Sequence, residues 1–477
     1  MSETQPVEPK HITPILNLLR SHRFRFWFFV ACLLAVIGWG AYAFYLESVY
    51  GLGLTGDRLP NAWGTNIVDF VFFIAISMAG TIVSGVLRAS NTSWRRPITR
   101  IAEMITIAAL PIGALFPMID LGVGKNAINL FIYGRLQSPI EWDTIAICSY
   151  LVASLIYFYL PLIPDFAACR DYLGKVGRVR KWLYSTLSLG WRGTPDQEHR
   201  LKSSIKIVAL LVVPIACCVH SVLAWVFAVL LKVEVHSTVF PIFFIAGAVY
   251  SGVATILVVL SAFRYFYHLE QYIEFKHILY LGWIFFASNL VMIYLTVTEY
   301  LTPAWGAEVL DTQYIQSITV GPWAPLFWFM IVGGFIIPAL IMVFPRTRTI
   351  GFIVFGALLA DAGMWIERYL FVVPSFAVPI LPYPPGQFFP SWEDMSVTAM
   401  GVAGFILILV VLSKLVPVVS IWEISEGETP GPTESPAIEL GGITAAVPQT
   451  TSQPPAAGSG ALVPAEKDGK SSEVALH

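Results

Sequence analysis

The chain has 477 residues, of which 56% are hydrophobic and only 13% are charged. Water-soluble domains carry about 25% charged residues, so most of this chain must face lipid or other apolar helices. Its formal net charge of -2 gives no reason to expect nucleic acid or an acidic ligand as a partner. The composition therefore predicts an all-α, polytopic membrane protein in contact with membrane lipids.

About ten apolar runs follow one another along the chain, each close to the ~20 residues that a membrane-spanning helix needs. They cover approximately residues 26–50, 66–88, 99–119, 141–163, 204–231, 238–262, 277–300, 323–344, 350–373 and 395–420. The first run is longer than the apolar core of a secretory signal, which is about 7–15 residues, so it predicts a spanning helix rather than a cleaved peptide.

The loops that join these runs alternate between basic and acidic. Basic residues gather at one set of ends, namely Arg88, Arg95, Arg96, Arg100, Arg170, Lys175, Arg178, Arg180, Lys181, Arg192, Arg200, Lys202, Arg264, Lys276, Arg346 and Arg348. Acidic residues gather at the other, namely Glu47, Asp57, Asp120, Glu141, Glu308, Asp311, Glu393 and Asp394. Because basic loops stay in the cytoplasm, this alternation predicts a multi-pass protein with both termini cytoplasmic.

Composition changes sharply at Ser425. The segment that follows is rich in Pro, Gly, Ser, Thr and Ala and cannot bury enough apolar surface to fold alone. We therefore predict a cytoplasmic N-terminal segment (1–25), a transmembrane domain (26–424) and a disordered cytoplasmic tail (425–477).

Two carboxylates stand where apolar runs meet the outer face. Asp120 follows the third run, and Asp143 lies at the start of the fourth. A carboxylate at the end of a buried span is costly unless it is used. A quinone head group needs a proton-accepting group near each carbonyl and an apolar slot for its ring, so we predict that this loop frames a quinone site. His236, Glu367 and Arg368 are predicted at the same level and join Asp120 and Asp143 in the candidate binding set.

These residues also have simpler interpretations. Asp120 can be a solvated loop acid, Asp143 an acid in the first turn of a helix, and His236 a loop histidine. Glu367 and Arg368 can form an interfacial ion pair.

Five further ionisable residues fall within the spans: Asp69, Glu103, His220, Glu299 and Asp361. Ionisable side chains inside a membrane mark ion or proton pathways by default, so these five are predicted to form a proton path. Asp361, near the middle of its span, is the hardest to explain without one, whereas His220 can equally be a hydrogen-bonded structural histidine.

Metal cofactors are not expected in this chain. None of its five cysteines forms a C-x-x-C motif, which argues against an iron–sulfur cluster. Only His220 is well inside a span, so paired histidine ligands for haem are not expected either. Redox chemistry would therefore use a diffusible cofactor or a partner subunit.

The spans also suggest an internal repeat. Residues 72–75 (FFIA) recur as residues 243–246, and residues 142–164 and 323–345 share a Trp-to-Pro spacing around the fourth and eighth spans. A repeat of four helices keeps the same orientation and would give two four-helix bundles. The alternative is chance, because such tetrapeptides are common in apolar sequence.

Several short segments, taken in order, resemble one membrane-protein family. They are Thr55-Gly56, Trp63-Gly64, Trp94-Arg-Arg-Pro-Ile-Thr-Arg100 with Glu103, Ser138-Pro139 with Trp142-Asp143, Leu162-Ile-Pro-Asp165, His220, Gly363-Met-Trp-Ile-Glu-Arg368 and Pro390-Ser-Trp-Glu-Asp394. On these residues the chain, over about residues 10–424, resembles the NrfD/PsrC family, the membrane subunits of polysulfide reductase, related molybdopterin enzymes and alternative complex III. The resemblance is closest to the ten-helix members of alternative complex III.

The resemblance implies two four-helix bundles with flanking helices in a bacterial inner membrane. It implies a site for menaquinone or ubiquinone near the outer face and, in some members, proton translocation. The implied partners are an extracytoplasmic iron–sulfur (ferredoxin-like) subunit, a second NrfD-like membrane subunit and cytochrome c subunits.

The chain keeps the family aspartate at Asp143 but departs from quinone-reactive relatives elsewhere. The departures are Asp120 in place of a histidine, Leu121-Gly-Val-Gly124 in place of Leu-Gly-Arg-Pro, Ser221 in place of an aspartate after His220, and Asp361 in place of an asparagine. Three functions therefore stay open. The first is a quinone-reactive subunit of a respiratory oxidoreductase that works only within its complex. The second is a sister subunit without a quinone site, which serves proton conduction or assembly. The third is a secondary transporter, suggested by the repeated bundles and the mid-membrane acids.

Overall fold

The computed structural model describes residues 19, 24–56, 61, 63–90, 92–122, 127–172, 177–230, 232–235, 237–379, 386 and 388–428. These residues all belong to one compact unit, Met1–Thr429. Most of the predicted N-terminal segment and residues 429–477 of the predicted tail lie outside the described residues.

Ten helices of the described chain are long and apolar enough to cross a membrane. They are α2 (Phe24–Tyr50), α3 (Thr65–Ala89), α4 (Arg96–Asp120), α6 (Pro139–Tyr159), α9 (Pro195–Ala228), α10 (Phe240–Phe266), α11 (Phe275–Gly306), α13 (Ala324–Phe329) continued by α14 (Ile337–Val343), α15 (Ile350–Ala377) and α16 (Trp392–Leu415). The described residues contain no β-strand, so the predicted all-α membrane fold is confirmed.

The fifth span begins at Pro195, well before the predicted start at residue 204. Thr194 explains the earlier start. Its side chain accepts a hydrogen bond from the backbone N–H of Gln197, and the Gln197 side chain binds back to the Thr194 backbone. This capping box starts a polar first turn that hydropathy alone does not detect.

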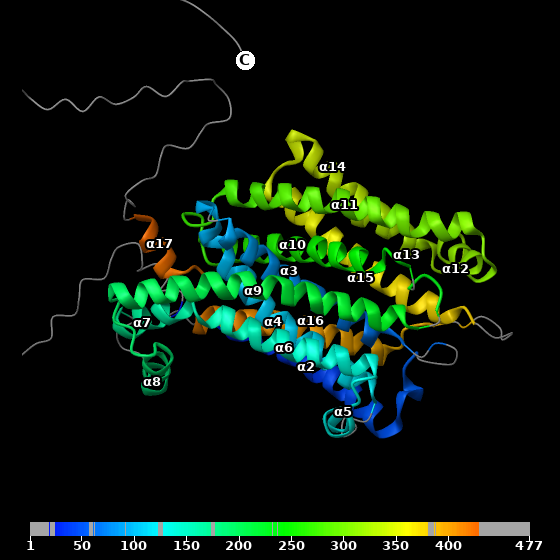
Figure 1. Cartoon of the computed structure of the whole chain (residues 1–477), viewed down its shortest axis with the longest axis horizontal. Helices are drawn as coiled ribbons and strands as arrows, with labels where there is room; N and C mark the ends of the chain where they lie inside the picture. The colour runs from blue at the N-terminus through cyan, green and yellow to red at the C-terminus, as the bar shows by residue number, and fades with distance from the viewer. Residues whose placement is uncertain are drawn as a thin grey trace, which may run out of the picture. The chain divides into compact units, whose positions relative to one another are not determined.

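The spanning helices form two four-helix bundles with two flanking helices (Figure 1). In the first bundle α3 packs on α4 and α9, and α6 closes the ring against α4 and α9. In the second, α10 packs on α11 and α15, and the α13–α14 span lies between α11 and α15. Helices α3 and α10 join the bundles, while α2 and α16 pack together outside them, with α16 against α4.

Small residues allow the bundles to approach closely. A Cβ built on Gly252 of α10 would lie 1.9 Å from the Cβ of Ala79 of α3. No side chain fits there without separating the helices, which is the usual role of small residues in membrane helix packing.

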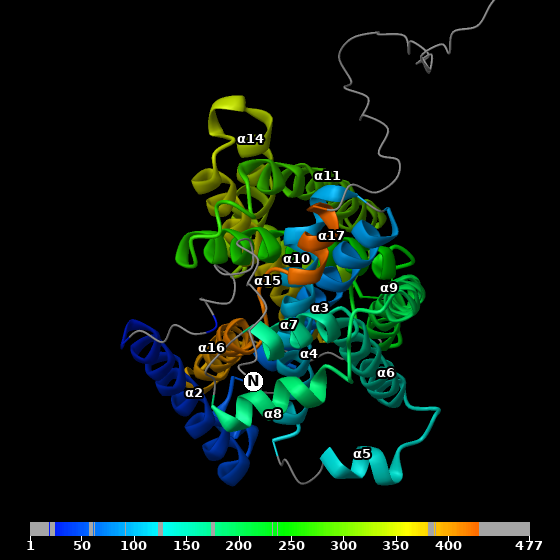
Figure 2. The same ribbon diagram turned by 90° about the vertical axis from the view of Figure 1, so that its left-hand side faces the viewer.

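Short helices lie at both ends of the spans. Helices α5 (Ala127–Tyr133) and α12 (Val309–Thr319) lie at the end where Asp120 and Asp143 are found, which we call the acidic end (Figure 1). Helices α7 (Leu162–Tyr172), α8 (Arg178–Leu187) and α17 (Ile421–Glu428) lie at the opposite, basic end. Figure 2 faces the basic end and shows α8 along its length, lying across the ends of the spanning helices.

Buried ion pairs close the first bundle at the basic end. Arg88 binds both Glu103, at 2.8 Å, and Glu423 of α17, at 2.6 Å, and Arg95 binds the second oxygen of Glu423 at 2.8 Å. Arg100 binds Asp165 of α7 at 2.7 Å, with both side chains fully buried. Helix α17 runs to Glu428, past the predicted domain end at 424. Its Glu423 holds this end of the first bundle together through the ion pairs with Arg88 and Arg95.

Candidate functional site

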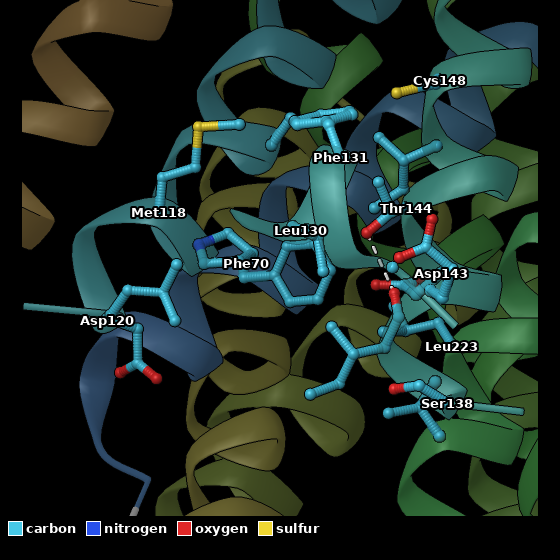
Figure 3. Close-up of a pocket in the computed structure, with 18 of the residues that line it drawn as sticks. Phe70, Met118, Asp120, Leu130, Phe131, Ser138, Asp143, Thr144, Cys148 and Leu223 are labelled. Carbon is cyan, nitrogen blue, oxygen red and sulfur yellow. Dashed lines mark hydrogen bonds between the residues drawn. The ribbon is translucent and has the colours of Figure 1, made fainter. Parts of the chain in front are cut away.

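A cavity of about 600 Å³ opens into the first bundle at the acidic end. It lies between the last turns of α4, helix α5, the first turns of α6 and the facing sides of α3 and α9 (Figure 3). Its lining is mostly apolar and includes Ile67, Phe70, Ala114, Met118, Leu130, Phe131, Ile147, Leu223, Val226 and Phe227. A cavity of this size with a mostly apolar lining is typical of a small-molecule binding site.

Prolines and a tryptophan shape the backbone around this cavity. Pro117, which lines the cavity, has no backbone N–H and leaves the carbonyl four residues earlier in α4 without its helical partner. Ser138 and Pro139 then start α6, with Pro139 in the first helical turn, where its missing N–H costs nothing. The indole N–H of Trp142 donates to the carbonyl of Leu136 at 2.6 Å and holds the preceding loop against α6.

Asp143 is the best-defined polar group of this cavity. It lies in the first turns of α6 and is only 9% exposed. In the described part of the chain its buried oxygen Oδ1 has no hydrogen-bond partner. A buried carboxylate without a partner is costly as an anion. It is therefore suited to hold a proton or to bind a group that brings one.

Asp120 ends α4 on the other side of the same cavity. Figure 3 shows Asp120 and Asp143 on opposite sides, with Phe70 and Leu130 between them. The two acids predicted to act together thus share one cavity.

Glu141 and Arg135 also line the cavity near its polar rim. A Cβ built on Gly134 would lie 2.4 Å from Oε2 of Glu141, so the glycine makes room for this carboxylate. The loop before α6 and the first turn of α6 therefore each contribute one charged group to the cavity lining.

Glu367 and Arg368, predicted at the same level as Asp143, do not line this cavity. They are buried in the second bundle, where the Arg368 guanidinium binds Glu367 and lies 5.5 Å from the ring centre of Phe244. Rings of Phe227, Phe244 and Phe371 pack at 5.3–6.0 Å between the two regions. His236, also in the predicted set, lies outside the described residues.

A cluster of acids surrounds Glu367 at the acidic end of the second bundle. Glu299 of α11 accepts hydrogen bonds from the hydroxyl of Ser237 at 2.6 and 2.8 Å. Glu234, in the loop between α9 and α10, is bound by the hydroxyl of Tyr300. Burial, and then the charges of Glu299 and Glu367, raise the pKa of the Glu234 carboxyl well above its ordinary value.

The five residues predicted as a proton path lie at separate places. Asp69 of α3 accepts from the Trp365 indole at 2.7 Å and from the Thr398 hydroxyl at 2.5 Å, so it joins α3 to α15 and α16. Glu103 belongs to the ion pairs of the basic end, and Glu299 to the acid cluster of the second bundle.

Of the remaining two predicted path residues, His220 of the first bundle contacts Phe244 of α10, and Asp361 lies within the second bundle. His220 of α9 is fully buried, 6.4 Å from Phe244 between ring centres, and neither ring nitrogen has a partner among the described residues. Asp361 of α15 accepts from the hydroxyl of Thr255 of α10 at 3.2 Å.

Sequence reasoning missed a row of hydroxyl groups inside the first bundle. The Tyr150 hydroxyl lies 2.7 Å from that of Thr81 and donates to the carbonyl of Ser77 at 2.9 Å. One further step toward the basic end, the hydroxyls of Tyr157 and Ser84 lie 2.8 Å apart, and Ser84 donates to Glu103 at 2.9 Å. The signal was present in the spacing, because Tyr150 and Tyr157 follow Asp143 at steps of seven residues and share one face of α6.

Comparison with known proteins identifies the family. Residues 53–379 match the family model described as "Polysulphide reductase, NrfD". The chain belongs to the NrfD family.

Curated relatives span most of the chain. A putative membrane subunit of dimethyl sulfoxide reductase from Halobacterium salinarum is 27% identical over 74% of this chain and 77% of its own length. An Hdr-like menaquinol oxidoreductase integral membrane subunit of Archaeoglobus fulgidus is 24% identical over 73% and 79%. A menaquinone reductase integral membrane subunit of Nitratidesulfovibrio vulgaris is 24% identical over 83% and 92%.

The NrfD match covers both four-helix bundles, from α3 to α15. It includes the cavity and the acid cluster, but leaves α2, α16 and α17 outside. Glu423, which binds Arg88 and Arg95 of the matched region, therefore lies outside that region.

Proposed function

We propose that this NrfD protein is the membrane subunit of a respiratory quinone oxidoreductase of the alternative complex III type, and that the quinone ring enters the cavity between Asp120 and Asp143. The observation that carries this proposal is the largely apolar cavity of about 600 Å³ with a buried, unpartnered carboxylate oxygen on Asp143. The names of two relatives, a menaquinol oxidoreductase subunit and a menaquinone reductase subunit, support the ligand class and favour menaquinone.

A bound quinol gives up two electrons and two protons when it is oxidised, and a bound quinone takes up the same number when it is reduced. In this proposal Oδ1 of Asp143 holds and transfers one proton at the ring oxygen on the α6 side, and Asp120 serves the opposite side. Phe70, Leu130 and Phe227 exclude water from the ring and place it between the two acids. The proposed binding set keeps these two acids and leaves out Glu367 and Arg368, which lie in the other bundle. His236, also predicted for the set, lies outside the described residues.

The partner proposal follows from the location of the cavity. We place the basic end in the cytoplasm and the acidic end outside a bacterial inner membrane, as the distribution of Lys and Arg suggests. An iron–sulfur subunit would then meet the acidic end, beside α5, where Ile128 and Ile132 are 60% and 61% exposed. A second NrfD-like subunit and cytochrome c subunits would complete the complex.

Binding of a menaquinol analogue to the intact complex tests the quinone site. Wild type should bind, and Asp143→Asn should weaken binding by tenfold or more, because the amide cannot take the proton. The matched control is Asp196→Asn, the same change at an exposed position in the first turn of α9. Wild-type complex that fails to bind the analogue would instead support a sister subunit without a quinone site.

A second function is favoured by the hydroxyl row from Tyr150 to Glu103. Tyr150 with Thr81 forms one hydrogen-bonded group, and Tyr157 with Ser84 and Glu103 forms a second. If protons pass within and between these two groups, the first bundle would conduct protons between the basic end and the cavity. Of the residues first predicted for a proton path, Glu103 is the one that this proposal uses. Proton uptake by the complex in vesicles, compared between wild type and Glu103→Gln, tests it. Equal uptake by both would contradict it.

A further inference from the structure

Glu234 occupies an unusual position in the loop between α9 and α10. Its backbone has φ 72°, in the left-handed region that a residue with a side chain rarely adopts. Its side chain is nevertheless only 7% exposed, at the acidic end of the second bundle. One carboxylate oxygen is bound by Tyr300, and the other, Oε2, is buried and has no hydrogen-bond partner among the described residues.

The groups that act on Glu234 are mainly acidic. Glu299 of α11, Glu367 of α15 and Asp311 of α12 all act on Glu234 through their negative charges. Arg368 brings a positive charge to this cluster, but it already binds Glu367.

Other titratable groups nearby do not offer Glu234 a counter-charge in the described structure. Lys232, two residues away, lies 4.9 Å from the ring centre of Phe376. His220 faces Phe244, and His236 lies outside the described residues. Oε2 of Glu234 therefore has neither a hydrogen bond nor an ion pair in the part of the chain that the structure describes.

Such a carboxyl favours its protonated form. Removing an ionised carboxylate from water without a compensating charge is unfavourable, so a buried acid among other acids keeps its proton instead. The single hydrogen bond from Tyr300 favours the anion, but burial and three neighbouring negative charges oppose it.

We propose that Glu234 is a proton-binding site of the second bundle, separate from the cavity of the first, and that it holds a proton at neutral pH and exchanges it with water at the acidic end. The exchange requires only the transfer of one proton between the carboxyl group and water, with no redox partner. The rings of Phe227, Phe244 and Phe371 separate this site from the cavity, so the proton does not have to come from a quinone. Because Glu234 lies in the loop between α9 and α10 at the acidic end, its proton can reach water there without crossing the bundle.

Infrared spectroscopy of the full chain at pH 7 tests this proposal without any quinone. A protonated carboxylic acid has a carbonyl stretch, separate from the amide bands, that shifts in D₂O. Wild type should show this band, and Glu234→Gln should lose the intensity of one acid. The matched control, Glu308→Gln at an exposed position of the same end, should leave the band unchanged. Identical spectra for wild type and Glu234→Gln would overturn the proposal.

A second variant keeps the proposal testable if Glu234→Gln does not fold. Tyr300→Phe keeps the acid but removes its hydrogen bond, so the band should stay and move to higher wavenumber. A carbonyl band that is equally strong and unmoved in Tyr300→Phe would show that the signal comes from another acid and would also overturn the assignment. Failure of analogue binding to the cavity would not affect either result, so the two proposals can be judged separately.

Discussion

Buried carboxylates at the two ends of the protein differ in their partners, apart from Glu367 at the acidic end, which binds Arg368. At the basic end Glu423 and Asp165 each bind a guanidinium at 2.6–2.7 Å. At the acidic end Asp143 and Glu234 each bury an oxygen that has no partner among the described residues. A carboxylate beside a fixed guanidinium stays ionised and holds helices together, whereas one without a partner can change its protonation state. The comparison therefore separates acids that stabilise the fold from acids that are available for proton chemistry. Substitutions in the two groups should have different effects on stability and turnover.

The largest expected effect is on stability at the basic end. Arg100→Leu leaves Asp165 buried without its counter-charge and should lower the free energy of unfolding by about 3–5 kcal/mol. Thermal unfolding of the purified chain measures this. The double variant Arg100→Leu with Asp165→Leu should recover most of the loss, because an apolar pair of similar volume replaces the ions. Equal destabilisation in the single and double variants would mean that the loss of stability comes from altered packing and not from the unpaired charge.

Asp143→Asn should have the opposite pattern. Quinol turnover by the complex should fall about 100-fold, which corresponds to about 2.7 kcal/mol in the transition state, if Asp143 transfers the proton. Its unfolding temperature should stay the same or rise, because no buried carboxylate remains to be neutralised. An unfolding temperature that falls as far as that of Arg100→Leu would place Asp143 among the structural acids instead.

Glu423→Gln tests the same comparison through pH. Burial alone would raise the pKa of Glu423, but Arg88, Arg95 and Arg100 together hold it below its ordinary value of 4.5. The carboxylate therefore contributes stability above about pH 4.5, and this contribution is lost as the pH falls through the lowered pKa. Glu423→Gln should be less stable than wild type by about 2 kcal/mol at pH 7, and the difference should shrink below pH 4.5. A difference that is constant with pH would contradict this role.

Much of this architecture could be predicted from the sequence. Hydropathy and the alternation of basic loops define the spans, because the bilayer fixes both their length and their flanking charges. Asp120 and Asp143 could be assigned to one site because a single connection, residues 121–138, joins the ends of their helices. Depth in the membrane is thus readable from distance along the chain.

Lateral position is not readable in this way. Glu367 was predicted to share a site with Asp143. Which bundle the Glu367 side chain faces depends on how α15 packs against the other helices, and the sequence does not specify this packing. Glu234 was missed because a loop acid resembles a solvated one until the backbone turns it inward. Glu423 was missed because it precedes a change in composition that suggested the end of the folded chain.

The smallest effect is expected for Tyr150→Phe. The change removes a hydroxyl from the row in the first bundle, but Thr81 keeps its contact with Thr106 at 3.3 Å, so the loss of stability should be about 1 kcal/mol. Tyr159→Phe, which removes a half-buried hydroxyl bound to the Leu187 carbonyl outside the row, is the matched control. If the row conducts protons, proton uptake by the complex should slow in Tyr150→Phe and not in Tyr159→Phe, although both lose one hydroxyl. Equal uptake in the two variants would reduce Tyr150 to a packing role and place it with the structural groups of the basic end.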